Sequence, residues 1–109
     1  MKWDQRLRAR INIGADGDNT IVGTPGASSI IEIDHINFIV TGAGNTITLK
    51  DGSNVIADYP LPVNGTFVFD NSNPNYNTIV LGVGNSLLIN MSGISSSVKG
   101  FVLYRITDK

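Results

Sequence analysis

Residues 30–41, with the sequence Ile-Ile-Glu-Ile-Asp-His-Ile-Asn-Phe-Ile-Val-Thr, decide which fold the chain can adopt. The stretch is rich in β-branched residues, and its apolar and polar side chains alternate as they do in a strand with one buried face. The alternation changes parity in the middle: Ile31 and Ile33 alternate with Glu32 and Asp34, whereas Ile36, Phe38 and Val40 lie at the opposite parity. Such a change moves the apolar side chains to the opposite face of a regular strand. We therefore predict a bulge near Asp34–Ile36, or a strand that bends from one sheet of a sandwich to the other.

The rest of the chain repeats this strand pattern between short turn signals. Glycine and asparagine, which tolerate a positive φ, recur about every ten residues. The runs between them give nine candidate strands at residues 6–13, 20–22, 30–41, 46–50, 55–59, 66–70, 78–83, 86–91 and 98–107. Many short strands with regular turns are typical of a sandwich or a barrel. We predict an all-β, antiparallel, jelly-roll-like β-sandwich of about eight or nine strands.

Two segments allow sharper local predictions. Asp51-Gly52 is a hairpin signal, so residues 47–50 should pair with residues 55–58. Pro60 and Pro62 cannot donate ladder hydrogen bonds, so the segment around them should be an edge strand or an extended crossing segment.

Length and composition set limits on the function. The chain has 109 residues, no cysteine, 16% charged residues and a formal net charge of −1. It contains no apolar run near the ~18 residues that span a bilayer, so we expect no membrane segment. We expect one unit, with a basic N-terminal arm or first strand at residues 1–18 and a β-sandwich domain at residues 19–109. A chain this short has a small stability margin alone, which oligomerisation would increase.

The basic first strand is the least ordinary charge feature. Residues 6–13 alternate strictly, and the even positions hold three arginines, Arg6, Arg8 and Arg10, with Trp3 preceding them. These four residues are our candidate partner-binding segment, which would dock on an acidic surface, with an apolar face formed by Leu7, Ile11 and Ile13. The alternative is a solvated edge strand whose charges discourage unwanted edge pairing. Nucleic acid is not expected, because aromatic residues do not interleave with the basic ones.

The sequence offers little material for catalysis or for a cofactor. His35 is the only histidine, and we interpret it as a solvent-facing or hydrogen-bonded structural residue. Glu32 and Asp34, two positions apart, are interpreted as part of a solvated strand face rather than as a pair of catalytic carboxylates. Asp16-Gly17-Asp18-Asn19 offers oxygen ligands but lacks the spacing of a calcium-binding loop. We expect no enzyme activity, no metal and no cofactor.

An asparagine-rich segment is a second candidate contact surface. Tyr76 lies among Asn73, Asn75 and Asn77, and an aromatic ring flanked by amides suits sugar stacking or subunit contact. The alternative is a tyrosine that folds over the rim of the core.

From about Asn19 to Ile106 the order of turns and strands resembles a known class of proteins. The matching segments are Pro25-Gly26, Thr41-Gly42-Ala43-Gly44, the run from Thr46 to Gly52, Pro60-Leu61-Pro62, Asn64-Gly65, Phe67-Val68-Phe69, the run from Gly84 to Ser92, and the run from Val98 to Tyr104. The pattern is similar to the small jelly-roll-like β-sandwich proteins of tailed bacteriophage virions. The resemblance implies a structural role in capsid decoration, neck, tail or head fibre, usually as an oligomer, and it transfers no site residue.

We therefore expect a virion structural protein, most simply an oligomeric capsid decoration or stabilising protein that binds other virion proteins such as the capsid shell. A closed homotrimer is the favoured oligomer. A carbohydrate- or receptor-binding module of a phage adhesin is the alternative, with Tyr76 and its neighbouring asparagines as the contact surface.

Overall fold

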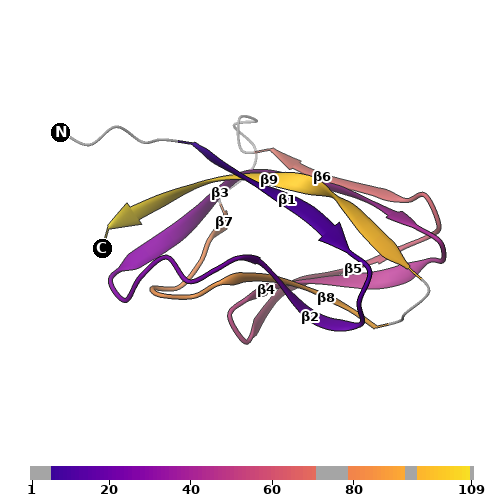
Figure 1. Ribbon diagram of the computed structural model, residues 1–109, viewed down its shortest axis with the longest axis horizontal. Coiled ribbons are helices and arrows are strands. Elements are labelled where there is room, and N and C mark those ends of the chain that lie inside the picture. Colours follow the sequence, from indigo (N-terminus) through magenta and orange to yellow (C-terminus); the bar gives the residue numbers. More distant parts are fainter. Residues whose placement is uncertain (1–5, 71–78, 93–95, 109) are drawn as a thin grey trace.

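The computed structural model describes residues 6–70, 79–92 and 96–108, and within these ranges the chain forms nine strands and no helix. The strands make two antiparallel sheets that pack face to face (Figure 1). The predicted all-β sandwich is therefore confirmed. In the same ranges, no helix is long and apolar enough to cross a membrane.

The two sheets share the strands almost equally. The five-stranded sheet has the order β1-β9-β3-β6, with the short β7 also paired to β3: β1 (Leu7–Ile13), β9 (Ser97–Asp108), β3 (Ser29–Thr41), β6 (Thr66–Asp70) and β7 (Ile79–Val80). The four-stranded sheet has the order β2-β8-β4-β5: β2 (Gly17–Val22), β8 (Leu87–Met91), β4 (Asn45–Asp51) and β5 (Asn54–Leu61).

The pairing of the strands is that of a jelly roll. Once the two-residue β7 is set aside, each strand pairs with its counterpart from the other end of the chain: β1 with β9, β2 with β8, β3 with β6 and β4 with β5. The chain is thus one long antiparallel hairpin that rolls up, and the pairs β3–β9 and β4–β8 join its turns into two sheets. The expected jelly-roll-like topology is confirmed.

The change of parity in β3 is resolved by a bulge. The register between β3 and β9 pairs Ile33 with Tyr104 but His35 with Leu103, so Asp34 is the extra residue of the bulged strand. Because of this insertion, Ile33 and Ile36 both lie fully buried between the sheets. The predicted bulge is confirmed, and it is centred on Asp34.

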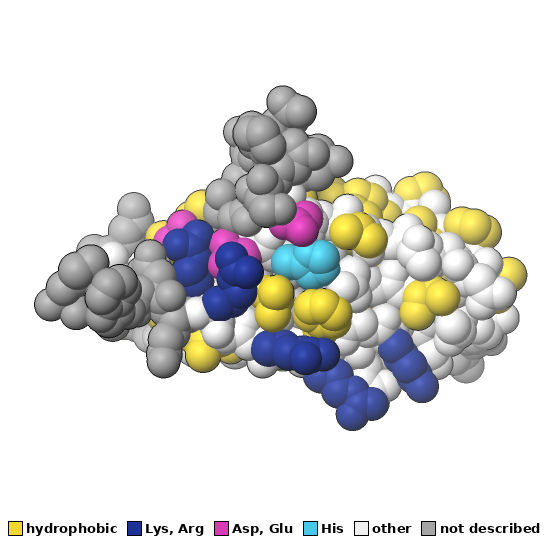
Figure 2. All heavy atoms as spheres, turned by 90° about the horizontal axis from the view of Figure 1, so that it is seen from above, with side chains coloured by type: hydrophobic (Ala, Val, Ile, Leu, Met, Phe, Trp, Pro, Cys, Tyr) yellow, Lys and Arg dark blue, Asp and Glu magenta, His cyan; other side chains and the backbone are white. Residues whose placement is uncertain are grey.

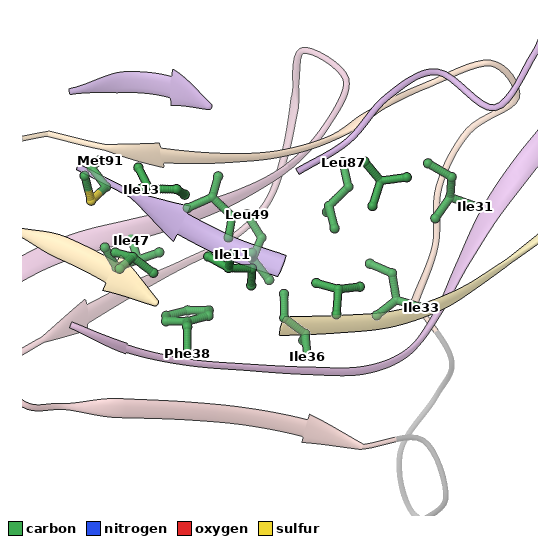
Figure 3. Close-up of a cluster of buried hydrophobic side chains, with 14 of the residues drawn as sticks. Ile11, Ile13, Ile31, Ile33, Ile36, Phe38, Ile47, Leu49, Leu87 and Met91 are labelled. Atoms are coloured by element: carbon green, nitrogen blue, oxygen red, sulfur yellow. The ribbon is translucent and has the colours of Figure 1, made fainter. Parts of the chain in front are cut away.

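The core fills the space between the two sheets with apolar side chains from both inner faces (Figure 3). Those with no more than 2% exposure include Ile11, Ile31, Ile33, Ile36, Phe38, Val40, Ile47, Leu49, Leu81, Leu87, Ile89, Met91, Val98 and Val102. Phe38 stacks on Phe67 with ring centroids 5.1 Å apart, which extends the core to β6. Removal of this apolar surface from water, at roughly 25 cal/mol per Å², is the main force that holds the two sheets together.

The local predictions for the four-stranded sheet also hold. β4 and β5 form the expected hairpin, in which Asp51 pairs with Asn54 and Gly52 adopts a φ of 60°. β5 lies at the sheet edge, where the missing N–H of Pro60 is tolerated. Asp51 also fixes the neighbouring turn, because its carboxylate accepts hydrogen bonds from the backbone N–H of Gly82, at 3.0 and 3.2 Å, and from the Asn85 amide, at 2.9 Å.

Gly100 is required by the close approach of β9 to β3. It pairs with Phe38 on β3 and with Ile11 on β1, and a Cβ at this position would overlap the carbonyl oxygen of Asn37. Backbone cannot move aside as a flexible side chain can, so the two central strands keep their spacing only with glycine here.

We predict that Gly100→Ala lowers the free energy of unfolding by about 3 kcal/mol, because the added methyl forces β9 away from β3. Urea denaturation followed by far-ultraviolet circular dichroism measures this change. Gly14→Ala is the matched control: a Cβ at Gly14 meets nothing within 4 Å, so stability should stay within about 0.5 kcal/mol of the wild type. Equal stability of the two variants would contradict the prediction.

Candidate functional site

The outer face of the five-stranded sheet places side chains from four strands in rows. Buried residues at alternate positions fix the inner side of each strand, so the residues between them point outward. The register gives three rows across β1, β9, β3 and β6: Arg8, Leu103, His35 and Asp70; Arg10, Phe101, Asn37 and Val68; and Asn12, Lys99, Ile39 and Thr66. Figure 2 shows this face, with one group of Lys and Arg side chains beside carboxylates and a second group along the border of the face.

The first group is an ion-pair cluster at the bulge, formed around the buried carboxylate of Asp34. Two hydrogen bonds, of 2.9 and 3.0 Å, join the Arg105 guanidinium to the Asp34 carboxylate, and Arg6 Nε adds a third at 3.3 Å. The Asp34 side chain is only 3% exposed, whereas the Arg105 side chain is 26% exposed. Asp34 was expected on a solvated strand face, and that interpretation is wrong. The bulge turns its carboxylate into the sheet, where two guanidinium groups replace the lost water.

Glu32, the other carboxylate of that pair, is partly buried and accepts a hydrogen bond of 2.9 Å from the Thr107 hydroxyl. The two acids therefore have separate partners and do not act as a pair.

A stack of three side chains crosses the middle of the face. The Arg8 guanidinium carbon lies 4.6 Å from the centroid of the Phe101 ring, and the His35 ring stacks on the same residue at 5.3 Å. Because β9 lies between β1 and β3, Arg8 and His35 approach Phe101 from opposite sides. Both faces of the aromatic ring are therefore covered, and each contact is of a favourable cation–π or stacking type.

His35 is held by neighbours on its own sheet. The amide nitrogen of Asn37 lies 2.9 Å from His35 Nε2, and Nδ1 of His35 lies 3.5 Å from the Asp70 carboxylate. His35 is thus half-buried and hydrogen-bonded, which is one of the two environments expected for it.

The second group of cations consists of Arg8, Arg10 and Lys99, all of them exposed. Within the described ranges, no ion pair to a carboxylate engages any of the three. Beside Lys99 the surface is hollowed, with a volume of about 320 Å³, and the hollow is lined mainly by Asn37, Ile39, Thr66, Val68 and Lys99. This part of the face is basic and has an apolar floor.

β1 supplies two of these cations as an edge strand of the sandwich. Its outward face holds Arg8 and Arg10 as predicted, but Ile11 and Ile13 are buried in the protein's own core. Of the expected apolar docking face of this strand, only Leu7, which is 38% exposed, is therefore open to a partner. The expected boundary after residue 18 falls inside β2, Gly17–Val22. Trp3 lies outside the described residues.

The Asp16–Asn19 segment, whose last three residues begin β2 rather than forming a loop, is organised by hydrogen bonds within the protein. The Asp18 carboxylate accepts bonds from Lys50 Nζ, at 3.0 and 3.1 Å, and from the Asn90 amide, at 2.7 Å. The Asn90 amide, followed by the Lys50 ammonium, lowers the pKa of Asp18. Lys50 and Asp18 thus form an ion pair within the four-stranded sheet. Among the residues that the structure describes, no three His, Asp or Glu side chains are grouped as metal ligands.

Sequence reasoning found Arg6, Arg8 and Arg10 but missed Lys99, Phe101, Asn37 and Arg105. The alternation of residues 98–107 does place Lys99, Phe101 and Arg105 on one face, and that is the signal that could have been used. Tyr76, Asn73, Asn75 and Asn77 lie outside the described residues.

Comparisons of the sequence with models of known protein families and with curated proteins found no match.

We predict that Asp34→Ala lowers the free energy of unfolding by about 3 kcal/mol, because it leaves the partly buried guanidinium of Arg105 without its carboxylate. Chemical denaturation measures the loss. Asp58→Ala is the matched control, since Asp58 is exposed and accepts one hydrogen bond from Thr48, so its loss should cost about 1 kcal/mol or less. A loss at Asp34 no larger than that at Asp58 would show that the cluster does not stabilise the bulge.

Proposed function

We propose that this protein is a structural protein of a tailed bacteriophage virion, in which it acts as an oligomeric decoration or stabilising protein on the capsid shell. The observation that supports this role best is the outer face of the five-stranded sheet. It presents exposed cations on a sheet whose other side is fully packed. A basic and partly apolar face suits attachment to an acidic protein surface.

Several side chains on this face are already held in place, which favours binding to a large, rigid partner. Arg8 rests on Phe101, and His35 is fixed by Asn37 and Asp70, so these side chains have little rotamer freedom left to lose. Because ordering a long side chain on binding costs about 0.5–1.5 kcal/mol, a face that is ordered beforehand retains more of its contact energy.

The low content of charged residues also supports assembly, because it reduces the cost of burying an interface. Only 16% of the residues are charged, so a buried interface on this protein would remove few charged groups from water. The turns are rich in Asn, Ser and Thr, which can form hydrogen bonds across an interface without bringing a net charge into it.

We predict that the protein is found in purified phage particles by mass spectrometry, and that Arg8→Gln combined with Arg10→Gln weakens co-sedimentation with particles by roughly tenfold or more. Higher salt should weaken the wild type in the same direction, since exposed charges are screened over about 8 Å at physiological ionic strength.

Thr20→Glu combined with Thr46→Glu is the matched control for net charge. Both threonines are exposed on strands of the four-stranded sheet, and the pair makes the same change of two charges. Undiminished binding of the arginine variant, or equal weakening of the control, would argue against attachment through this face.

We also predict a closed oligomer, with a trimer as the favoured state, because a single 11.7 kDa copy has a small core and association would stabilise it. Light scattering coupled to size exclusion should give about three times the monomer mass at tens of micromolar protein. A monomer under those conditions would refute this prediction.

A further inference from the structure

We infer that the outer face of the five-stranded sheet binds carboxylate side chains of an acidic protein segment, at a basic strip formed by Arg8, Arg10 and Lys99 beside the Phe101 ring. The inference deepens the proposed function and rests on it, because it names the chemistry of the surface to which the protein would attach. It also changes the set of residues that the sequence indicated: Lys99 is added and Arg6 is set aside.

The cations of this face differ in whether they already bind a carboxylate within the protein. Arg105 and Arg6 both bind the Asp34 carboxylate, so each already has a carboxylate partner within the protein. In the part of the chain that the structure describes, Arg8, Arg10 and Lys99 have no such ion pair, and Asp70 is the nearest carboxylate in the three rows. The strip therefore has an excess of positive charge that an acidic partner would balance.

Phe101 favours a carboxylate over a sugar ring. A sugar stacks on the open face of an aromatic ring, but Arg8 and His35 cover both faces of Phe101. What remains for a ligand is the ring edge, which is the positive part of the aromatic quadrupole. A carboxylate at this edge would meet the three cations and the positive rim together.

The hollow beside Lys99 suits the rest of an acidic side chain. Thr66 and Asn37 provide polar atoms at its border, while Ile39 and Val68 give it an apolar floor. Val68 is 62% exposed, which leaves apolar surface that a partner would cover. The methylene groups of a glutamate can lie on that floor while its carboxylate reaches Lys99.

The spacing of the strip matches an extended acidic segment. Arg8 and Arg10 are two residues apart on one strand, so their Cα atoms are separated by about 6.6 Å. Alternate side chains of an extended peptide have the same repeat. Nucleic acid fits less well, because its affinity depends on neutralising many phosphates, whereas this strip has three cations on a chain of net charge −1.

A short fluorescent peptide of alternating glutamate and serine tests the inference on the purified protein. We expect binding in low salt, measured by fluorescence anisotropy, and no binding of the peptide in which glutamine replaces glutamate. Arg10→Gln combined with Lys99→Gln should weaken binding at least roughly fivefold. The Thr20→Glu and Thr46→Glu control makes the same change of net charge on the other sheet and should remain within about twofold of the wild type.

A nitrogen–proton NMR titration with the same peptide locates the contact. Amide shifts should change in β1 and in β9 near Phe101, and remain in place in β2 and β8. Shifts confined to the four-stranded sheet, an Arg6→Gln loss as large as that of the double variant, or tighter binding of an oligothymidine than of the acidic peptide would each overturn the inference.

The two proposals can fail separately. If the acidic peptide does not bind but the protein is found in particles, the basic strip is wrong and another surface provides attachment. If the peptide binds at the strip but the protein is not found in particles, the virion role is wrong and the strip has another acidic partner.

Discussion

The bulge at Asp34 is the constraint on which the rest of the five-stranded sheet depends. β3 is 13 residues long, and its apolar side chains change parity within it, so a regular strand would bury only half of them. One inserted residue returns Ile36 and the residues after it to the core. Because β3 pairs with β9, β6 and β7, the position of this insertion also decides which residues of those strands lie beside His35 on the outer face.

An ion pair between Arg105 and Asp34 offsets the free-energy cost of the bulge. A bulge disrupts the ladder locally, and here it also places a carboxylate that is 97% shielded from solvent within the sheet. Arg105 lies on β9, and Asp34 lies on β3. Their ion pair therefore joins the two strands whose pairing changes register at the bulge. A buried ion pair adds little net stability compared with well-packed apolar groups, but it strongly penalises any register that separates the two charges. The cluster therefore acts mainly to specify one register.

The sequence predicts the parts of this protein that depend on local periodicity. The nine strands, the Asp51-Gly52 hairpin and the bulge all follow from alternation and turn residues. The solvated interpretation of Asp34 was wrong because a bulge reverses the face of the residue within it. The placement of Lys99 in the row next to that of Arg10 was not predictable, because it depends on the pairing of β1 and β3 with a strand nearly 60 residues or more away in the chain. Long-range register of this kind leaves no mark in a single sequence.

The position of Lys99 also bears on the two interpretations of the basic first strand. Positive charge on an edge strand can be explained by edge protection alone, because it prevents unwanted pairing with another sheet. Arg8 and Arg10 on β1 fit that explanation. Lys99 lies on β9, which is paired on both sides, to β1 and to β3. A cation there protects no edge, and it lies one row from Arg10, facing the same solvent. Edge protection thus accounts for two of the three cations, whereas binding of an acidic surface accounts for all three.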